Sequence, residues 1–194
     1  MSELVGVPGD QLSPRQRLVE TAFRLFYEHG INAVGIDRVL AEAGVSKATL
    51  YRHFATKDGL IVEFVRLRDA RYRVWLRERV DALGSDPESR ILAVFGAIKE
   101  RCQAGDFRGC AFGNTVAELA DPDHPAHQAA REHKEAIRAY LAELLTQAGV
   151  REPEQLAGRF LLLIDGAVTT AVRDGSADAA DEARAIASTL LRAG

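Results

Sequence analysis

Cysteine is scarce in this sequence, with only Cys102 and Cys110 among 194 residues. Two thiols are too few for the disulfide framework of a small secreted protein, and they fit a reducing compartment. Long apolar runs are also missing, because Asp165 ends the longest stretch, 160–164, far short of the length that crosses a bilayer. The N-terminus has neither the basic nor the apolar region of a signal peptide. We therefore expect a cytoplasmic protein without a membrane-spanning segment.

The sequence also shows little that points to catalysis or metal binding. No nucleophile, base and orienting group form a recognisable set, and no glycine-rich phosphate loop occurs. The aspartates and histidines between 121 and 133 lack the spacing of zinc ligands, and the prolines among them indicate a turn. We expect no catalytic residue, no metal and no cofactor, and an enzyme is the least favoured alternative.

Charge is divided unevenly along the chain, although the net value is only -3. Residues 1–80 contain 13 Lys and Arg against 10 Asp and Glu, a net charge of +3. Residues 81–194 contain 12 against 18, a net charge of -6. A basic N-terminal part is compatible with nucleic-acid binding, because phosphates are attracted by a local patch and not by the average over the chain.

Alternating strand patterns and internal repeats are absent, and helical patterns fill the chain. We expect an all-α fold of about nine helices, the first opened by Ser13 and Pro14 and closed by Gly30. The others are expected at 36–43, from Ser46 to His53, from Thr56 to Leu83, from Asp86 to the glycines at 105 and 109, at 110–120, from the turn at 121–125 to Gly149, from Pro153 to Val172 and at 178–192.

The most informative stretch is 36–54, where two short amphipathic helices flank a tight turn of the length that a helix-turn-helix needs. Gly44 can adopt the positive φ that ends the first helix, and Ser46 can cap the second. Leu50 and Phe54 form the inner face of the second helix. So small an apolar face adds little stability, and the polar residues around it suit a recognition helix in the major groove.

Residues in and after this stretch resemble the signature of TetR-type transcription regulators: Gly44-Val45-Ser46, Thr49-Leu50-Tyr51, His53-Phe54 and Lys57. The close resemblance covers about 13–75, and the remainder matches only in being helical and of the right length. It implies a homodimer that a small-molecule effector releases from a double-stranded, pseudo-palindromic DNA operator. The organisation it implies is a flexible N-terminus at 1–12, a helix-turn-helix domain at 13–56, a connecting helix at 57–84, and a ligand-binding and dimerisation domain at 85–194.

The resemblance also suggests roles for individual side chains. Lys47, Ala48 and Thr49 would face base edges, while Tyr51, His53 and Lys57 would hold phosphates. Arg38 would add a contact from the outer face of the preceding helix, and the cap Ser46 is grouped with this set. Gly35 departs from the family, which commonly has Ser or Thr there, so no side-chain phosphate contact is expected at that position. Alternatives remain: Tyr51 and His53 as packing residues, and Lys57 as a solvated charge.

The helix expected at 160–172 is apolar almost all round, which predicts burial against a second copy of the chain. With the helix at 178–192 it would form a four-helix interface, as the resemblance also implies. The alternative is that both helices complete the core of one chain. Asp165 is expected to be a buried carboxylate with a structural partner. The residues expected at the interface are Phe160, Ile164, Gly166, Ala167, Ala171, Ile186 and Leu190.

The effector region is less readable, and its candidates are chosen by position. They are Trp75, Phe95, Cys110, Phe112, Asn114 and His133. Cys110 lies near a helix start and two residues after Arg108, and both features favour a thiolate. A regulator that senses oxidants or electrophiles through Cys110 is therefore an alternative, against a small buried thiol without reactivity.

Overall fold

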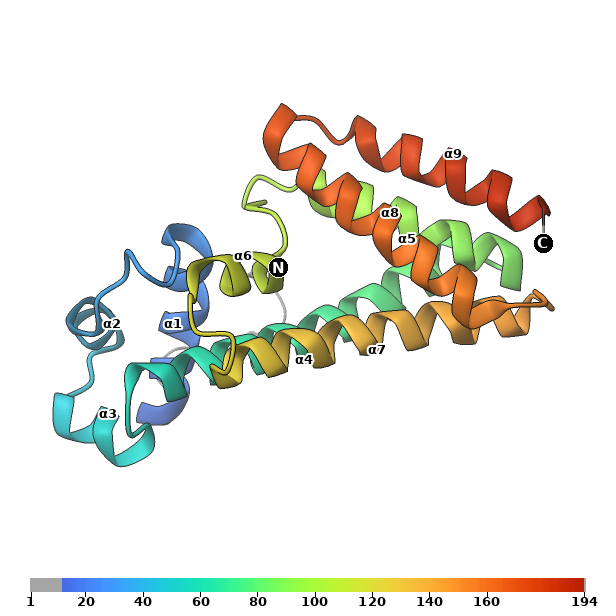
Figure 1. Cartoon of the computed structure of the whole chain (residues 1–194). Helices are drawn as coiled ribbons and strands as arrows, with labels where there is room; N and C mark the ends of the chain where they lie inside the picture. The colour runs from blue at the N-terminus through green and yellow to red at the C-terminus, as the bar shows by residue number, and fades with distance from the viewer. Residues whose placement is uncertain (1–11, 194) are drawn as a thin grey trace. The chain divides into compact units, whose positions relative to one another are not determined.

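The computed structural model describes residues 12–193, and every regular element within that range is an α-helix (Figure 1). The all-α prediction is confirmed. The helices are α1 (Pro14–His29), α2 (Ile36–Ala43), α3 (Lys47–His53), α4 (Lys57–Leu83), α5 (Pro87–Gln103), α6 (Ala111–Glu118), α7 (Pro125–Gln147), α8 (Pro153–Asp174) and α9 (Asp178–Ala193). The segment predicted to be flexible, 1–12, lies outside the described residues except for its last member.

Local capping chemistry sets the helix ends, as predicted. Ser13 forms a capping box with Gln16 at the start of α1, and Asp86 forms another with Ser89 at the start of α5. The hydroxyl of Thr56 accepts from the Gly59 amide at 3.3 Å, at the start of α4. Because these bonds satisfy amides that lack partners within the helix, the helix starts can be read from sequence.

The described chain divides into two compact units that do not follow the chain order. Unit 1 comprises residues 12–71 together with 111–131, and unit 2 comprises 72–110 together with 132–193. Unit 1 therefore contains not only α1, α2 and α3 but also α6 and the turn after it, which lie within the segment 85–194 predicted to bind ligand and dimerise.

The core of unit 1 is formed where α1 meets the following helices. Leu18, Leu25 and Leu50 are fully buried, and α1 packs against α3. Phe64 of α4 contacts Phe26 edge-on, with ring centroids 5.7 Å apart. These contacts hold the short helices α2 and α3, which could not fold alone.

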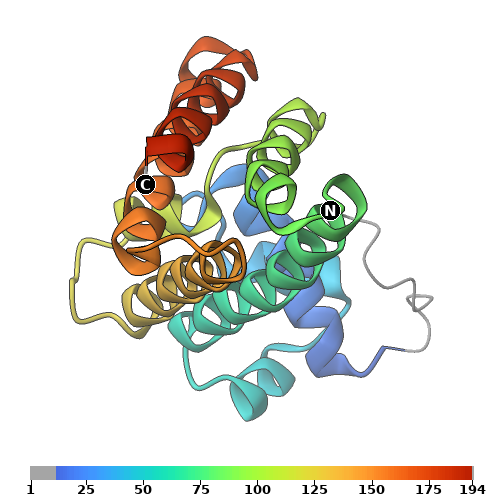
Figure 2. The same ribbon diagram turned by 90° about the vertical axis from the view of Figure 1, so that its right-hand side faces the viewer.

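The core of unit 2 combines residues of α5, α8 and α9, which pack against one another, with residues from the end of α4 and from α7. Figure 2 shows α7 running beside α4. Phe95 of α5 and Phe160 of α8 meet edge-on at 5.6 Å in the centre of the core. Among the described helices, α8 is long and apolar enough to cross a membrane by length and composition alone. Core helices of soluble proteins pass the same test, and one face of α8, including Phe160 and Ile164, is buried inside this unit.

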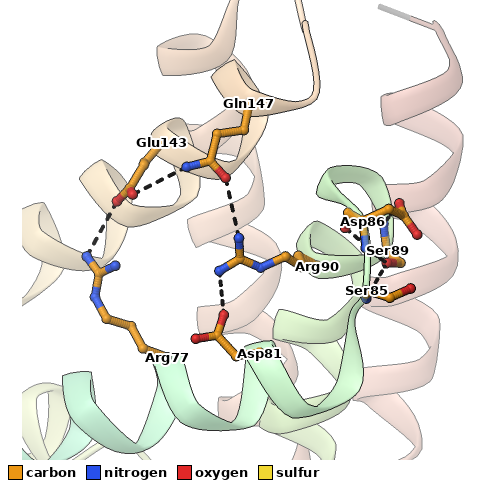
Figure 3. Close-up of polar contacts among 8 residues, drawn as sticks. All are labelled: Arg77, Asp81, Ser85, Asp86, Ser89, Arg90, Glu143 and Gln147. Carbon is orange, nitrogen blue, oxygen red and sulfur yellow. Dashed lines mark hydrogen bonds and ion pairs between the residues drawn. The ribbon is translucent and has the colours of Figure 1, made fainter.

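A chain of polar contacts joins α4, α5 and α7 within unit 2 (Figure 3). Arg77 donates to Glu143 at 3.5 Å, and Gln147 donates to the same carboxylate at 3.4 Å. Arg90 donates to Gln147 at 3.5 Å and also pairs with Asp81. Exposed contacts of this kind add little stability individually, but together they fix the register of three helices.

The turn between α4 and α5 depends on the absence of a side chain at Gly84. A Cβ there would lie 2.6 Å from Cα of Arg90, inside the backbone of the next helix. We expect Gly84→Ala to lower the free energy of unfolding by about 1–3 kcal/mol, as overpacking does. Gly158→Ala is the control, because its Cβ meets nothing within 4 Å, and it should be neutral or stabilising by about 0.5–1 kcal/mol. Urea denaturation measures both, and equal stability of the two variants would refute this account of the turn.

Candidate nucleic-acid interface

The turn between α2 and α3 has the geometry that the sequence predicts. Gly44 adopts the left-handed conformation, with φ of 62°, and ends α2. The Ser46 hydroxyl accepts from the Thr49 amide at 3.2 Å and lies 2.9 Å from the Thr49 hydroxyl, so it caps α3. Leu50 and Phe54 are buried, as predicted for the inner face. Two short helices are thus held around a three-residue turn with their polar residues facing outward.

Most of the predicted DNA contacts are exposed side chains. Tyr51 is 50% exposed, so packing does not account for this aromatic side chain. His53 is also exposed, and Thr49 is half-buried. The other exposed members of the predicted set are Arg38, Ser46, Lys47 and Ala48.

The cations among these predicted contacts, Lys47 and Arg38, form weak, exposed ion pairs. Lys47 lies 3.8 Å from Asp37, and Arg38 donates to Glu42 at 3.0 Å. Hydrogen bonds from Arg24 and Arg38 hold the pKa of Glu42 below its usual value. Because exposed pairs contribute about 0–1 kcal/mol, phosphates can replace these carboxylates at little cost. Gly35 caps α2 without a side-chain bond, as predicted.

Lys57 has a partner within the protein. Its ammonium donates to the carbonyl of Ile31 at 2.7 Å and lies 5.8 Å from the ring centre of Phe26. Burial lowers the pKa of Lys57, and the charges of Asp58 and Glu118 only partly oppose this effect. The side chain is therefore not a freely solvated charge, and any phosphate would share its ammonium with Ile31.

The arginines of α4 largely serve the fold. The Arg68 guanidinium is buried over the ring of Tyr27 at 3.8 Å. Arg71 pairs with Glu20 of α1, and Arg79 donates two bonds of 2.8 Å to Glu100. These contacts describe a salt-bridged helix face and not a second DNA surface.

The candidate effector residues fall in both units. In unit 2, the ring of Tyr72 lies tilted against Trp75 and meets His133 edge-on, with centroid distances of 5.4 and 5.3 Å. His133 is buried, and burial raises the pKa of Tyr72. Phe95 belongs to the hydrophobic core, where its ring meets that of Phe160 edge-on.

The two candidates on α6 belong to unit 1 and differ in exposure. Phe112 is buried, whereas Asn114 is exposed. Among residues 12–193, no group of three His, Cys, Asp or Glu side chains is arranged to hold a metal ion.

Cys110 of unit 2 contacts a charged side chain that the sequence analysis did not link to it. The Lys134 ammonium donates to the Cys110 sulfur and pairs with Asp165. Burial lowers the pKa of Lys134, but the nearby Cys110 and Asp165 outweigh it, so the net shift is upward. Asp165 is not the buried carboxylate expected, because its side chain is 42% exposed at the edge of α8.

Comparison with known proteins identifies the family. Residues 18–64 match the family described as bacterial regulatory proteins, tetR family. Residues 87–189 match the C-terminal domain described as transcriptional regulator LmrA/YxaF-like. The chain belongs to the TetR family.

Relatives and solved structures agree over nearly the whole length. The regulator YjdC of Escherichia coli is 25% identical over 92% of this chain and 93% of its own. The TetR-family regulator SCO4454 of Streptomyces coelicolor superposes with a TM-score of 0.83 and 35% identity, covering 92% of this chain and 94% of that one. The E. coli NemR structure, a reduced form, superposes with a TM-score of 0.78 and 24% identity, covering 90% and 95%.

The predicted dimer residues of this TetR-family chain divide into two groups, and one needs correction. Ile186 is 47% exposed, Gly166 is exposed and Leu190 is half-buried. The others pack inside their own chain because they lie on the face of α8 that covers α5 and α9, so they are not available to a partner. These core residues are Phe160, Ile164, Ala167 and Ala171.

Arg17 supports the helix-turn-helix head, which consists of α1, α2 and α3, and the sequence did not predict this role. From α1 its guanidinium donates to the carbonyl of Ala43 at 3.1 Å and to that of Gly44 at 3.4 Å. These carbonyls lie at the end of α2 and lack partners within the helix. A cation at a helix C-terminus also opposes its partial negative charge. Arg17 therefore fixes the turn that aims α3, over a sequence distance no local signal reveals.

We expect Arg17→Ala to lower the free energy of unfolding by about 1.5–3 kcal/mol, the usual contribution of charged hydrogen bonds to buried or half-buried acceptors. The control is Arg24→Ala, which removes only exposed ion pairs with Glu28 and Glu42 and should cost below about 1 kcal/mol. Urea denaturation of the purified variants gives both values. Similar losses for the two substitutions would show that Arg17 has no special role at the turn.

Proposed function

We propose that this TetR-family protein is a transcriptional repressor that binds a pseudo-palindromic DNA operator as a homodimer and leaves it when a small-molecule effector binds. The observation that carries the proposal is the exposed polar face of a seven-residue helix, α3, which is capped and anchored but buries only one residue of its own. Two relatives, E. coli YjdC and NemR, are named as a transcriptional regulator and a transcriptional repressor. Such a protein would act in the cytoplasm.

Base contacts and phosphate contacts would come from different positions of the head. Lys47, Ala48 and Thr49 open α3, and the N-terminal residues of a recognition helix are those that reach base edges. Tyr51 and His53 lie further along the helix and would hold phosphates. Arg38 on α2 would add a phosphate contact once it leaves Glu42, and Lys57 would contribute beside Ile31.

A homodimer would use the outer faces of α8 and α9. Leu162 is 74% exposed on α8, and Ile186 is 47% exposed on α9. Gly166, which lies one turn after Leu162, is exposed and would allow the helices of two chains to approach closely. Large exposed aliphatic side chains on neighbouring helices favour burial against a second copy.

The proposed roles predict two classes of variant. Lys47→Ala and Thr49→Ala should relax sequence preference, because each lost base contact is worth about 1–3 kcal/mol of discrimination. Tyr51→Phe and His53→Ala should instead weaken binding to every duplex by similar factors. The measurement is fluorescence anisotropy on duplexes selected from a random pool, with two chains expected per duplex, followed by titration of metabolites for release.

The salt dependence of affinity distinguishes charged phosphate contacts from uncharged ones. Loss of a charged phosphate contact should reduce the slope of log affinity against log salt by about one, which Tyr51→Phe cannot do because it removes no charge. Arg52→Ala is a useful comparison, because Arg52 is exposed on α3 but carries no proposed base contact. Equal loss of specificity in both classes would contradict the division of roles.

A second candidate, redox sensing through Cys110, is favoured by the contact between its sulfur and the Lys134 ammonium. The thiolate is the form of cysteine that attacks oxidants. With hydrogen peroxide, the thiolate sulfur attacks one oxygen and the O–O bond breaks. The sulfur becomes a sulfenic acid, while the other oxygen leaves as hydroxide and takes a proton from solvent to become water. In this mode the effector would be an oxidant.

Cys102 offers a matched control for this second candidate, because burial raises the pKa of its thiol. Hydrogen peroxide should add one oxygen to the intact protein and weaken operator binding. Cys110→Ser should abolish both effects, whereas Cys102→Ser should retain them. Mass spectrometry and anisotropy on the same samples provide the measurement. Oxidation that persists in Cys110→Ser, or that leaves DNA binding unchanged, would rule out the redox mode.

A further inference from the structure

The loop between α1 and α2, residues 30–35, determines where α2 begins. Ile31 and Val34 are buried and anchor the loop in unit 1. The loop ends at Gly35, which caps α2 without a side-chain hydrogen bond. The start of α2 therefore lacks a side-chain cap, and its position depends on the contacts that hold loop 30–35.

Glu118, the last residue of α6, holds this loop by two hydrogen bonds. Its carboxylate Oε2 accepts from the Asn32 amide at 2.8 Å. Its backbone carbonyl accepts from Asn32 Nδ2 at 2.7 Å, which also satisfies an unpaired carbonyl at the helix end. Both residues belong to unit 1, although 86 positions separate them in the sequence.

Gly30 shows that the loop is shaped around this carboxylate. A Cβ at Gly30 would lie 3.0 Å from Glu118 Oε2, so a side chain would press on the acceptor. Its φ of 88° is also one that residues with side chains rarely adopt. The backbone conformation favours glycine at this position, and a side chain there would also have to displace the Glu118 carboxylate by a few tenths of an ångström.

Lys57 holds the same loop from another element. Its bond to the Ile31 carbonyl connects the loop to the first residue of α4, close after the recognition helix. Glu118 is near enough to this ammonium that its charge raises the pKa of Lys57 against the effect of burial. The loop that leads into α2 is thus fixed by α6 on one side and by α4 on the other.

We propose that Glu118 is a positioning residue for DNA binding: from the end of α6 it fixes loop 30–35, and through the loop it fixes α2 and the surface that α2 and α3 present. The inference rests on the proposed function, because it concerns how the head is held for a duplex. Glu118 itself contacts no DNA, since a carboxylate is repelled by phosphates. The segment 111–118 therefore helps to position α2 and α3 for DNA binding.

The test is the affinity of the full-length protein for a selected duplex, measured by anisotropy at several salt concentrations. Glu118→Ala removes a charged hydrogen bond and should weaken binding by about tenfold or more. The salt slope should stay that of the wild type, because no phosphate contact is lost. Glu118→Gln should bind within about threefold of the wild type, because its amide oxygen can still accept from the Asn32 amide.

Asp123→Asn is the matched control, because it removes a carboxylate from the same segment at an exposed position. It should leave affinity unchanged. Wild-type affinity in Glu118→Ala, tighter binding in that variant, or failure of Glu118→Gln to restore binding would each overturn the proposal. Circular dichroism at the assay temperature must show every variant folded. Should Glu118→Ala not fold, Asn32→Ala, which removes only the side-chain bond to α6, takes its place with the same expected direction.

Amide hydrogen exchange distinguishes failure of this inference from failure of the proposed function. If the wild type bound no selected duplex, the proposed function would fail. Exchange at residues 30–35 would still report the loop: it should be faster in Glu118→Ala than in the wild type and in Asp123→Asn. Unchanged exchange in Glu118→Ala would overturn the positioning role whether or not the protein binds DNA.

Discussion

Helix α3 is too short to be stable in isolation, and the rest of unit 1 supplies the contacts that hold it in place. It has seven residues, too few for a stable isolated helix, and only Leu50 among them is buried. Its position must therefore come from neighbours: the Ser46 cap, the left-handed Gly44, and Phe54, which is buried directly after the helix. Because the polar surface of α3 is proposed to contact DNA, little of the helix is left to pack against the rest of unit 1.

The same constraint explains why so many charged residues of unit 1 have internal partners. Arg17 binds carbonyls of the turn, Arg68 is buried over Tyr27, and Lys57 donates to Ile31. Arg17 and Lys57 hold the turn and the loop that flank α2, whereas Arg68 joins α4 to α1. The basic excess of residues 1–80 is thus partly structural. Exposed cations such as Lys47 and Arg38 form weak ion pairs, and Arg38 also contacts His29. The charge count alone therefore overstates how many cations are available to DNA.

Features set by local chemistry could be predicted from sequence, and those set by distant contacts could not. Ser13, Gly44 and Ser46 act on amides or carbonyls within a few residues, so their types and spacing disclosed the helix ends. Glu118 and Asn32 meet across 86 positions, and neither is unusual in its own segment. The apolar sequence of α8 showed that the helix would be buried but not which face would meet its own chain. Phe160 was therefore expected at the dimer interface, yet it lies in the core, and Leu162, which was not predicted there, is largely exposed.

The place of α6 within unit 1 bears on how an effector could act. A ligand changes DNA affinity only through its differential affinity for two arrangements of the head, typically a coupling of about 1–3 kcal/mol. The segment α6 starts one residue after Cys110, which contacts Lys134 in unit 2, and ends at Glu118, which contacts the head loop. Under the proposed positioning role, loss of the Glu118 bonds to Asn32 would cost an amount comparable with this coupling, so an effector that favoured a head without these bonds would weaken DNA binding.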